Sequence, residues 1–260
     1  MTLLERAKRT ISFAAGDLRA QSSFPWFTTS SREHLIPYEE IVEALEIAKY
    51  GDVGLHRDKG YFTNLVIPGA MKHCWLHTSD SQDTCGPFVG EITEATSDGV
   101  LSKSAVVPFV SDYAVLLRPI GVTDEERKGA CVKAEGVIGA EYDSDFKFNI
   151  EEELEFYNAK NEQDLQEAIN SLKASEAALQ RWSRAFSCSE LVAYCWWHKR
   201  NELRLYRRKF FGKDVILPVD FMHSGFEIVW CSESWTVDIA HKQGLGEEAM
   251  EMLVDWKNRG

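Results

Sequence analysis

The chain has 260 residues, of which 44% are hydrophobic, so it can bury a large core as one domain with insertions or as two small domains. Its formal net charge of -12 argues against nucleic acid or an anionic membrane surface as its main partner. The six cysteines form no CxxC pair and no regular framework, which is typical of reduced, buried thiols. Charged residues interrupt the first ten positions, and no stretch is long and apolar enough to span a bilayer. We therefore expect a cytoplasmic protein without a signal peptide or a transmembrane segment.

The first fifty residues predict two helices joined by an irregular, aromatic-containing link. Residues 2–20 place apolar side chains on one side of a helix, and residues 21–37 are rich in Ser and Thr. Residues 37–48 predict a second helix, because Pro37 stands at its start and acidic residues occupy its first turn.

From Gly51 onward the pattern changes to short strands separated by turns, followed by helices. The expected elements are a turn entering a strand at 51–56, a loop or short helix at 61–69, strands at 71–78, 90–96 and 114–118, a helix at 123–138, a strand or turn at 141–146, strands at 215–219 and 226–231, and a helix at 246–257. Residues 151–183 are acidic and favour helix, which predicts a solvated helical hairpin inserted in the domain.

A cysteine stands on the first turn of a further predicted helix. Ser187 followed by Glu190 is a capping-box pattern, and apolar residues then recur with the spacing of one buried helical face. Cys188 is thus placed where free backbone N–H groups and the positive end of the helix dipole favour a thiolate. A small buried cysteine at a helix end would have the same local pattern.

A cysteine nucleophile needs an imidazole to take its proton, and His73 and His77 lie in one segment. On a helix they could bind zinc together with Cys74 or Cys85. Pro and Gly before the segment, and Ser and Asp after it, favour a strand instead. Four residues of strand separate the two histidines by about 13 Å, too far to share one ion.

A third group must orient the imidazole, and the next predicted strand offers Glu91 and Glu94. Spacing alone does not choose between them. We expect Asp52 to form a turn rather than act as an acid catalyst, and His56 and His77 are candidates to flank the cleft.

An ordered set of short motifs resembles the circularly permuted NlpC-type cysteine hydrolases, the YiiX/YebB-like group with a papain-like fold. The motifs run from Gly51-Asp52-Val53-Gly54-Leu55 through Tyr61 to Gly69, His73, Glu94-Ala95 with Asp98-Gly99-Val100, Ser111-Asp112-Tyr113, Leu117-Arg118-Pro119, Tyr142-Asp143-Ser144-Asp145-Phe146 and Cys188-Ser189-Glu190-Leu191-Val192 to Leu217-Pro218-Val219-Asp220-Phe221. The chain departs from the group's pattern by a loop at 79–88 and by the acidic insertion.

The resemblance implies an α+β fold in which a small antiparallel sheet packs on the helix that carries the nucleophile. It implies Cys188 as nucleophile, His73 as general base and acid, and Glu94 as the residue that orients the imidazole. No cofactor and no metal are expected. The corresponding divisions are an N-terminal helical extension at 1–49, a hydrolase domain at 50–232 with its insertion near 150–183, and a C-terminal helical tail at 233–260.

The activity expected from these residues is hydrolysis of an amide bond through a thioester, on a peptide, a cell-wall-type peptide or an amino-acid amide. Two alternatives remain open. One is a lipid-directed acyl hydrolase or acyltransferase on the same site, with residues 61–68 contacting the acyl chain. The other is a binding module that keeps the fold without turnover.

Overall fold

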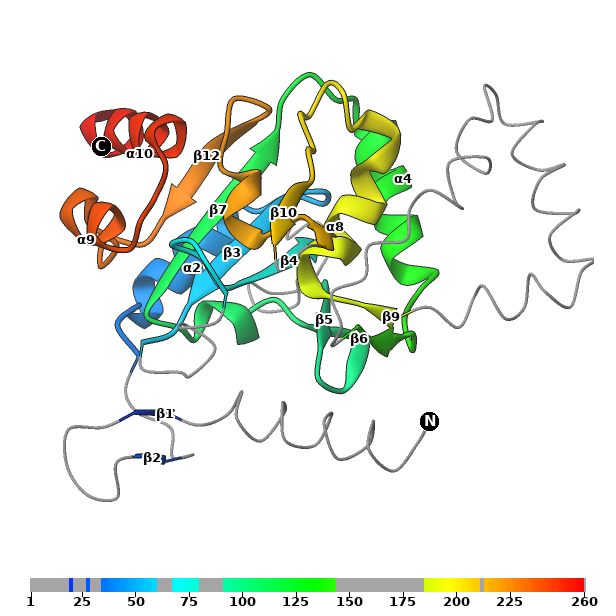
Figure 1. Ribbon diagram of the computed structural model, residues 1–260, viewed down its shortest axis with the longest axis horizontal. Coiled ribbons are helices and arrows are strands. Elements are labelled where there is room, and N and C mark those ends of the chain that lie inside the picture. The colour runs from blue at the N-terminus through cyan, green and yellow to red at the C-terminus, as the bar shows by residue number, and fades with distance from the viewer. Residues whose placement is uncertain are drawn as a thin grey trace, which may run out of the picture.

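The computed structural model describes residues 19–20, 27–28, 34–59, 67–79, 91–143, 185–210 and 213–259 (Figure 1). The predicted helix at 2–20 falls almost entirely outside these ranges. So do the loop 79–88 apart from its first residue, most of the segment 61–69, and the whole acidic stretch 151–183.

A six-stranded sheet in the order β12-β7-β3-β4-β5-β6 organises the described part of the chain, and every neighbouring pair in it is antiparallel. Its strands are β3 (Val53–Arg57), β4 (His73–His77), β5 (Glu91–Thr96), β6 (Gly99–Ser104), β7 (Tyr113–Pro119) and β12 (Phe226–Cys231). Short pairs lie outside it: β1 (Arg19–Ala20) with β2 (Phe27–Thr28), β8 (Glu141–Tyr142) with β9 (Ala185–Phe186), and β10 (Arg208–Phe210) with β11 (Lys213–Val215).

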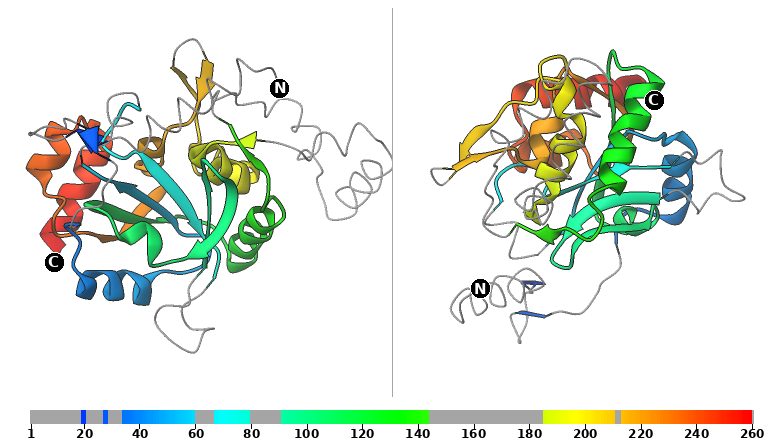
Figure 2. Two further views of the ribbon diagram at one scale, coloured as in Figure 1. Left: turned by 90° about the horizontal axis from the view of Figure 1, so that it is seen from below. Right: turned by 90° about the vertical axis from the view of Figure 1, so that its right-hand side faces the viewer.

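Helices cover both faces of this sheet, so the protein is α+β as expected. The α-helices are α2 (Tyr38–Ile47), α4 (Asp124–Glu135), α8 (Cys188–Trp196), α9 (Val237–Lys242) and α10 (Glu247–Arg259), and three-residue or four-residue 3-10 turns form η2 (Val107–Phe109), η4 (Trp197–Lys199) and η5 (Pro218–Phe221). In Figure 2 the helices α8 and α2 lie on opposite sides of the strands.

Two hydrophobic clusters correspond to the two faces, because successive side chains of a strand point to opposite sides. Val53 and Leu55 of β3 join the larger cluster beneath α8, whereas Trp75 of β4 joins the smaller cluster beneath α2. Apolar residues of α10, among them Leu253, belong to the larger cluster. Helices α2 and α10 thus pack on the sheet itself, and the proposed divisions near 49 and 232 stay predictions.

One predicted strand needs correction, and several elements were not predicted. The strand expected at 215–219 ends at Val215, because Pro218 begins the turn η5 and the Asp220 carboxylate accepts the Leu217 N–H at 2.8 Å. The sequence analysis did not predict β6, α9 or the short strands β2, β9 and β10, and the end of the helix expected at 2–20 forms strand β1. Strand β6 follows a tight turn after β5, and Gly99 has a φ of +103° there, which favours glycine.

Candidate active site

Helix α8 begins at Cys188 and is capped as its sequence predicts. Ser187 Oγ accepts a hydrogen bond from the Glu190 N–H at 3.4 Å, and Glu190 Oε2 accepts one from the Ser187 N–H at 2.8 Å. The cap satisfies the third N–H group of the helix but leaves those of Cys188 and the next residue without an intrahelical partner. An anion at the Cys188 side chain therefore lies against free donors and the positive end of the helix dipole.

Strands β4 and β5 separate close to this helix start. They pair only at Leu76 with Thr93 and at His77 with Ile92, and the pairing stops before Cys74 and His73. Helix α8 packs against both strands, as its position beside them in Figure 1 shows. The first residue of the helix therefore faces the place where the sheet opens.

His73 and Glu94 meet across this opening. His73 Nε2 lies 2.7 Å from Glu94 Oε2, and Lys103 Nζ of β6 lies 2.7 Å from the other carboxylate oxygen. Burial alone would raise the pKa of Glu94, since only 5% of its side chain is exposed, but the hydrogen bonds and charges of His73 and Lys103 lower it to about 2. Glu94 is thus an ionised acceptor that keeps one imidazole nitrogen protonated.

Cys188 interacts with the same imidazole. Its side chain hydrogen-bonds to His73, and since Nε2 is taken by Glu94, we infer that Nδ1 is the nitrogen that bonds to the sulfur. A hydrogen bond from the Cys74 thiol and the charge of His73 lower the pKa of Cys188 well below its usual value, against the opposing effect of burial. Burial also lowers the pKa of His73, but the charges and hydrogen bonds of Cys188 and Glu94 raise it to about 10. The two groups form a thiolate–imidazolium pair.

The structure thus brings together the three residues proposed from the sequence. Glu94 contacts the imidazole, whereas the backbone of Glu91 begins β5 and pairs with Ser104. His73 and His77 lie at opposite ends of strand β4, which is the spacing that argues against a shared zinc ion.

Sequence reasoning missed three neighbours of the site. Lys103 was missed because β6 was not predicted, and Cys74 was considered only as a zinc ligand. Tyr142 appeared only within a motif, yet burial, together with the charge of the neighbouring Cys188, raises the pKa of its phenol. The alternation of β4 could have indicated Cys74, because Cys74 and Leu76 share the face of the strand that helix α8 covers.

His56 supports the imidazole from the neighbouring strand, as one of the two flanking histidines suggested by the sequence. Its ring lies opposite His73 in the β3–β4 register, with ring centroids 5.0 Å apart and an edge-on contact. Burial and the charge of His73 lower the pKa of His56 to about 4, so this second imidazole is neutral. It adds packing without adding a competing positive charge.

Asp52 forms a separate buried cluster. Its carboxylate accepts the Lys49 N–H at 2.9 Å, as expected of a turn residue, and also hydrogen bonds from Arg118 at 2.7 and 3.0 Å and from Arg127 at 3.2 Å. The side chain is fully buried. Its partners are guanidinium groups, which stay protonated, so this cluster has no group that moves a proton.

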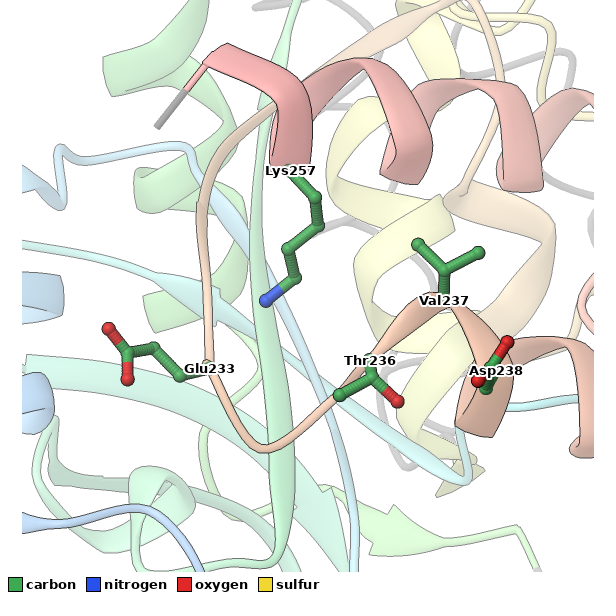
Figure 3. A pocket seen from close by; sticks show the side chains of 5 residues that line it. All are labelled: Glu233, Thr236, Val237, Asp238 and Lys257. Atoms are coloured by element: carbon green, nitrogen blue, oxygen red, sulfur yellow. The ribbon is translucent and has the colours of Figure 1, made fainter.

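A hollow elsewhere on the surface contains none of the three candidate residues. It has a volume of about 340 Å³, and Figure 3 shows Glu233, Thr236, Val237, Asp238 and Lys257 around it. The Lys257 ammonium donates a hydrogen bond to the Ser232 carbonyl at 2.9 Å, so it is held against the backbone. No thiol and no imidazole is among the residues that line the hollow.

Comparison with known proteins adds nothing to this geometry, since no family model, no curated protein and no solved structure matches the chain. In the described ranges, no helix has both the length and the apolar character needed to cross a membrane.

Proposed function

We propose that the protein is a cysteine hydrolase that cleaves an amide bond through a thioester, on a permuted NlpC-type variant of the papain-like fold. The observation that carries the proposal is the unbroken series of contacts from the Cys188 thiolate through the His73 imidazolium to the Glu94 carboxylate. A nucleophile, a proton carrier and an orienting group in that order are the requirements of covalent acyl transfer.

In the first half of the reaction the thiolate sulfur attacks the carbonyl carbon of the amide, and the C=O electrons move to oxygen. The free N–H groups at the start of α8 donate to that oxyanion. The oxyanion then collapses, the C–N bond breaks, and His73 gives its Nδ1 proton to the departing amine. The products are a free amine and a thioester on Cys188, with neutral His73 still donating from Nε2 to Glu94.

In the second half, neutral His73 takes a proton from water at Nδ1, and the hydroxide attacks the thioester carbon. The C–S bond breaks, the carboxylic acid leaves, and Cys188 departs as the thiolate beside imidazolium. The resting ion pair is restored without any external proton donor. Because this cycle needs a reduced sulfur, a reducing cytoplasm is the compartment that suits the proposal.

The amide is favoured over an ester because an amine is a poor leaving group unless it is protonated. With a pKa of about 10, His73 is still a cation at neutral pH and holds the proton that the amine needs. We therefore expect the substrate to be a peptide or an amino-acid amide. The segment proposed to contact an acyl chain in the lipid alternative lies almost wholly outside the described residues.

The test is hydrolysis of a library of peptide amides and matched esters by wild type, Cys188→Ala, His73→Ala and the control Cys131→Ala. Cys131 is a buried thiol on α4 that donates to the His77 carbonyl, away from the reacting sulfur. We expect no turnover by Cys188→Ala, a loss of about 10²–10⁴-fold in His73→Ala, and near wild-type rates in the control.

Circular dichroism and thermal unfolding show whether each variant is folded. Turnover by folded Cys188→Ala would refute the nucleophile assignment. Ester cleavage with no amide cleavage would favour the acyl hydrolase alternative. Failure of all probes, combined with a Cys188 that alkylates no faster than Cys131, would favour a binding module.

A further inference from the structure

Cys74 is the second thiol at the reacting sulfur, and nothing in the proposed mechanism uses it. It is fully buried on strand β4, directly after His73, and belongs to the same hydrophobic cluster as Cys188. Helix α8 packs on this strand, and the two side chains hydrogen-bond to each other. The contact joins two thiols from elements that are 114 residues apart in the sequence, so it arises only in the folded protein.

The backbone of Cys74 offers a second donor to the same sulfur. The His77 N–H donates to the Asp52 carbonyl at 2.8 Å, so the odd-numbered N–H groups of β4 point toward β3. The N–H of Cys74 therefore points the other way, toward β5, where the β4–β5 pairing has already stopped. It donates to Cys188 in place of a strand partner. The opening of the sheet thus frees one backbone donor for the thiolate.

We propose that Cys74 is a positioning residue that holds Cys188 as a thiolate by donating to its sulfur through both the thiol and the backbone N–H. This inference rests on the proposed function and extends it to the way the nucleophile is ionised. The Cys188 thiolate needs such donors, because the residue is only 5% exposed and a buried anion is unfavourable unless hydrogen-bond donors replace its hydration.

The direction of donation follows from the two environments. Burial, together with the negative charge of Cys188, raises the pKa of Cys74 well above its usual value, so this thiol keeps its proton. Cys188 lies at a helix start beside His73 and releases its proton instead. A thiol is also a small, mainly apolar side chain, so it fits the core while still providing a donor.

The test is the pH dependence of Cys188 alkylation by iodoacetamide, followed site by site by mass spectrometry in the full-length protein. Cys74→Ala removes the side-chain donor and keeps the backbone donor, whereas Cys74→Ser restores a side-chain donor. Cys74→Val removes the donor while filling the core, in case the alanine variant fails to fold. Cys131→Ala is the matched control, because its thiol bonds to a carbonyl of the same strand and not to Cys188.

We expect the midpoint of the Cys188 profile to rise by about one pH unit in Cys74→Ala and Cys74→Val, which slows alkylation about tenfold below the midpoint. The serine variant should recover part of that shift, and the control should not move. Unchanged midpoints in both donor-less variants would overturn the inference, as would a serine variant that shifts as far as the alanine variant, since packing alone would then explain the effect.

The proposed function fails in a different way. If wild-type Cys188 shows no reactivity below the ordinary thiol range near pH 8.5, there is no thiolate for Cys74 to hold, and the hydrolase proposal itself is refuted. If the wild type reacts at low pH and the Cys74 variants match it, only the role of Cys74 is refuted.

Discussion

Asp52 and Glu94 are two buried carboxylates, each with two cationic partners, at different places on the same sheet. Asp52 is bound by Arg118 and Arg127, and Glu94 is bound by His73 and Lys103. Both sites neutralise a charge that burial would otherwise make unfavourable.

The difference lies in what the partners can do next. A guanidinium keeps its proton at any accessible pH, so the Asp52 cluster can only hold β3, β7 and α4 together. An imidazole has a second nitrogen, and His73 hydrogen-bonds to Cys188 as well as to Glu94. Charge pairing by itself therefore does not identify an active site. The proposed active site rests instead on the contact of the paired imidazole with a thiol.

The comparison predicts that the largest effect on stability comes from Asp52→Asn. The amide can still accept the Lys49 N–H, but it leaves two largely buried arginines without a counter-charge. We expect a loss of about 3–5 kcal/mol in the free energy of unfolding, measured by urea denaturation. The pH profile of Cys188 alkylation should stay as in wild type while the protein is folded. A shifted profile with unchanged stability would show that the roles of the two clusters are reversed.

The same comparison shows what the sequence could predict. Helix α8 and its capping box were predictable, since the Ser187–Glu190 pattern is local and the structure confirms it. The pairing of His73 with Glu94 was not, because it depends on strands β4 and β5 separating after only two paired positions. Periodicity reports which residues share a face, but it does not report where two strands stop pairing. Only the resemblance pointed to Glu94 rather than Glu91.

Contacts made by elements that the sequence did not predict could not be predicted either. The role of Lys103 depends on β6, whose polar residues alternate too weakly to mark a strand, and the contact of Cys74 with Cys188 depends on how α8 lies on the sheet. Gly54 is a similar case: it stands opposite Trp75, and a Cβ atom there would lie 2.0 Å from the indole. Spacing in the sequence does not reveal that fit.

A smaller effect is expected from Glu94→Gln, which keeps an acceptor for His73 but removes the charge. The imidazolium then loses part of its stabilisation, so the pKa of His73 falls and the midpoint of Cys188 alkylation rises by about one unit. Turnover at pH values below the midpoint should fall roughly tenfold. An unchanged midpoint would show that Glu94 only orients the ring.

The stability of Glu94→Gln should also respond differently to acid. The pKa of Glu94 lies near 2 in the folded protein, below its ordinary 4.5, so its ionised form stabilises the fold above pH 4.5. That contribution is lost as the pH falls from 4.5 through about 2. The glutamine variant lacks the group that titrates, so its stability should decline less over this window, as measured by urea denaturation at several pH values.

The smallest effect is expected from Lys103→Gln. It should move the midpoint of Cys188 alkylation in the opposite direction to Glu94→Gln. Lys103 is 31% exposed, so its ion pair with Glu94 should contribute no more than about 1 kcal/mol to stability. Without it the pKa of Glu94 rises and acid unfolding begins at a higher pH. The imidazolium, however, loses a nearby positive charge, so the midpoint of Cys188 alkylation should fall slightly or stay in place. A midpoint that rises, as it is expected to do in Glu94→Gln, would contradict this prediction. Lys103 would then act by holding the Glu94 carboxylate in position beside His73. Position, and not the charge of Glu94, would then distinguish this cluster from the Asp52 cluster.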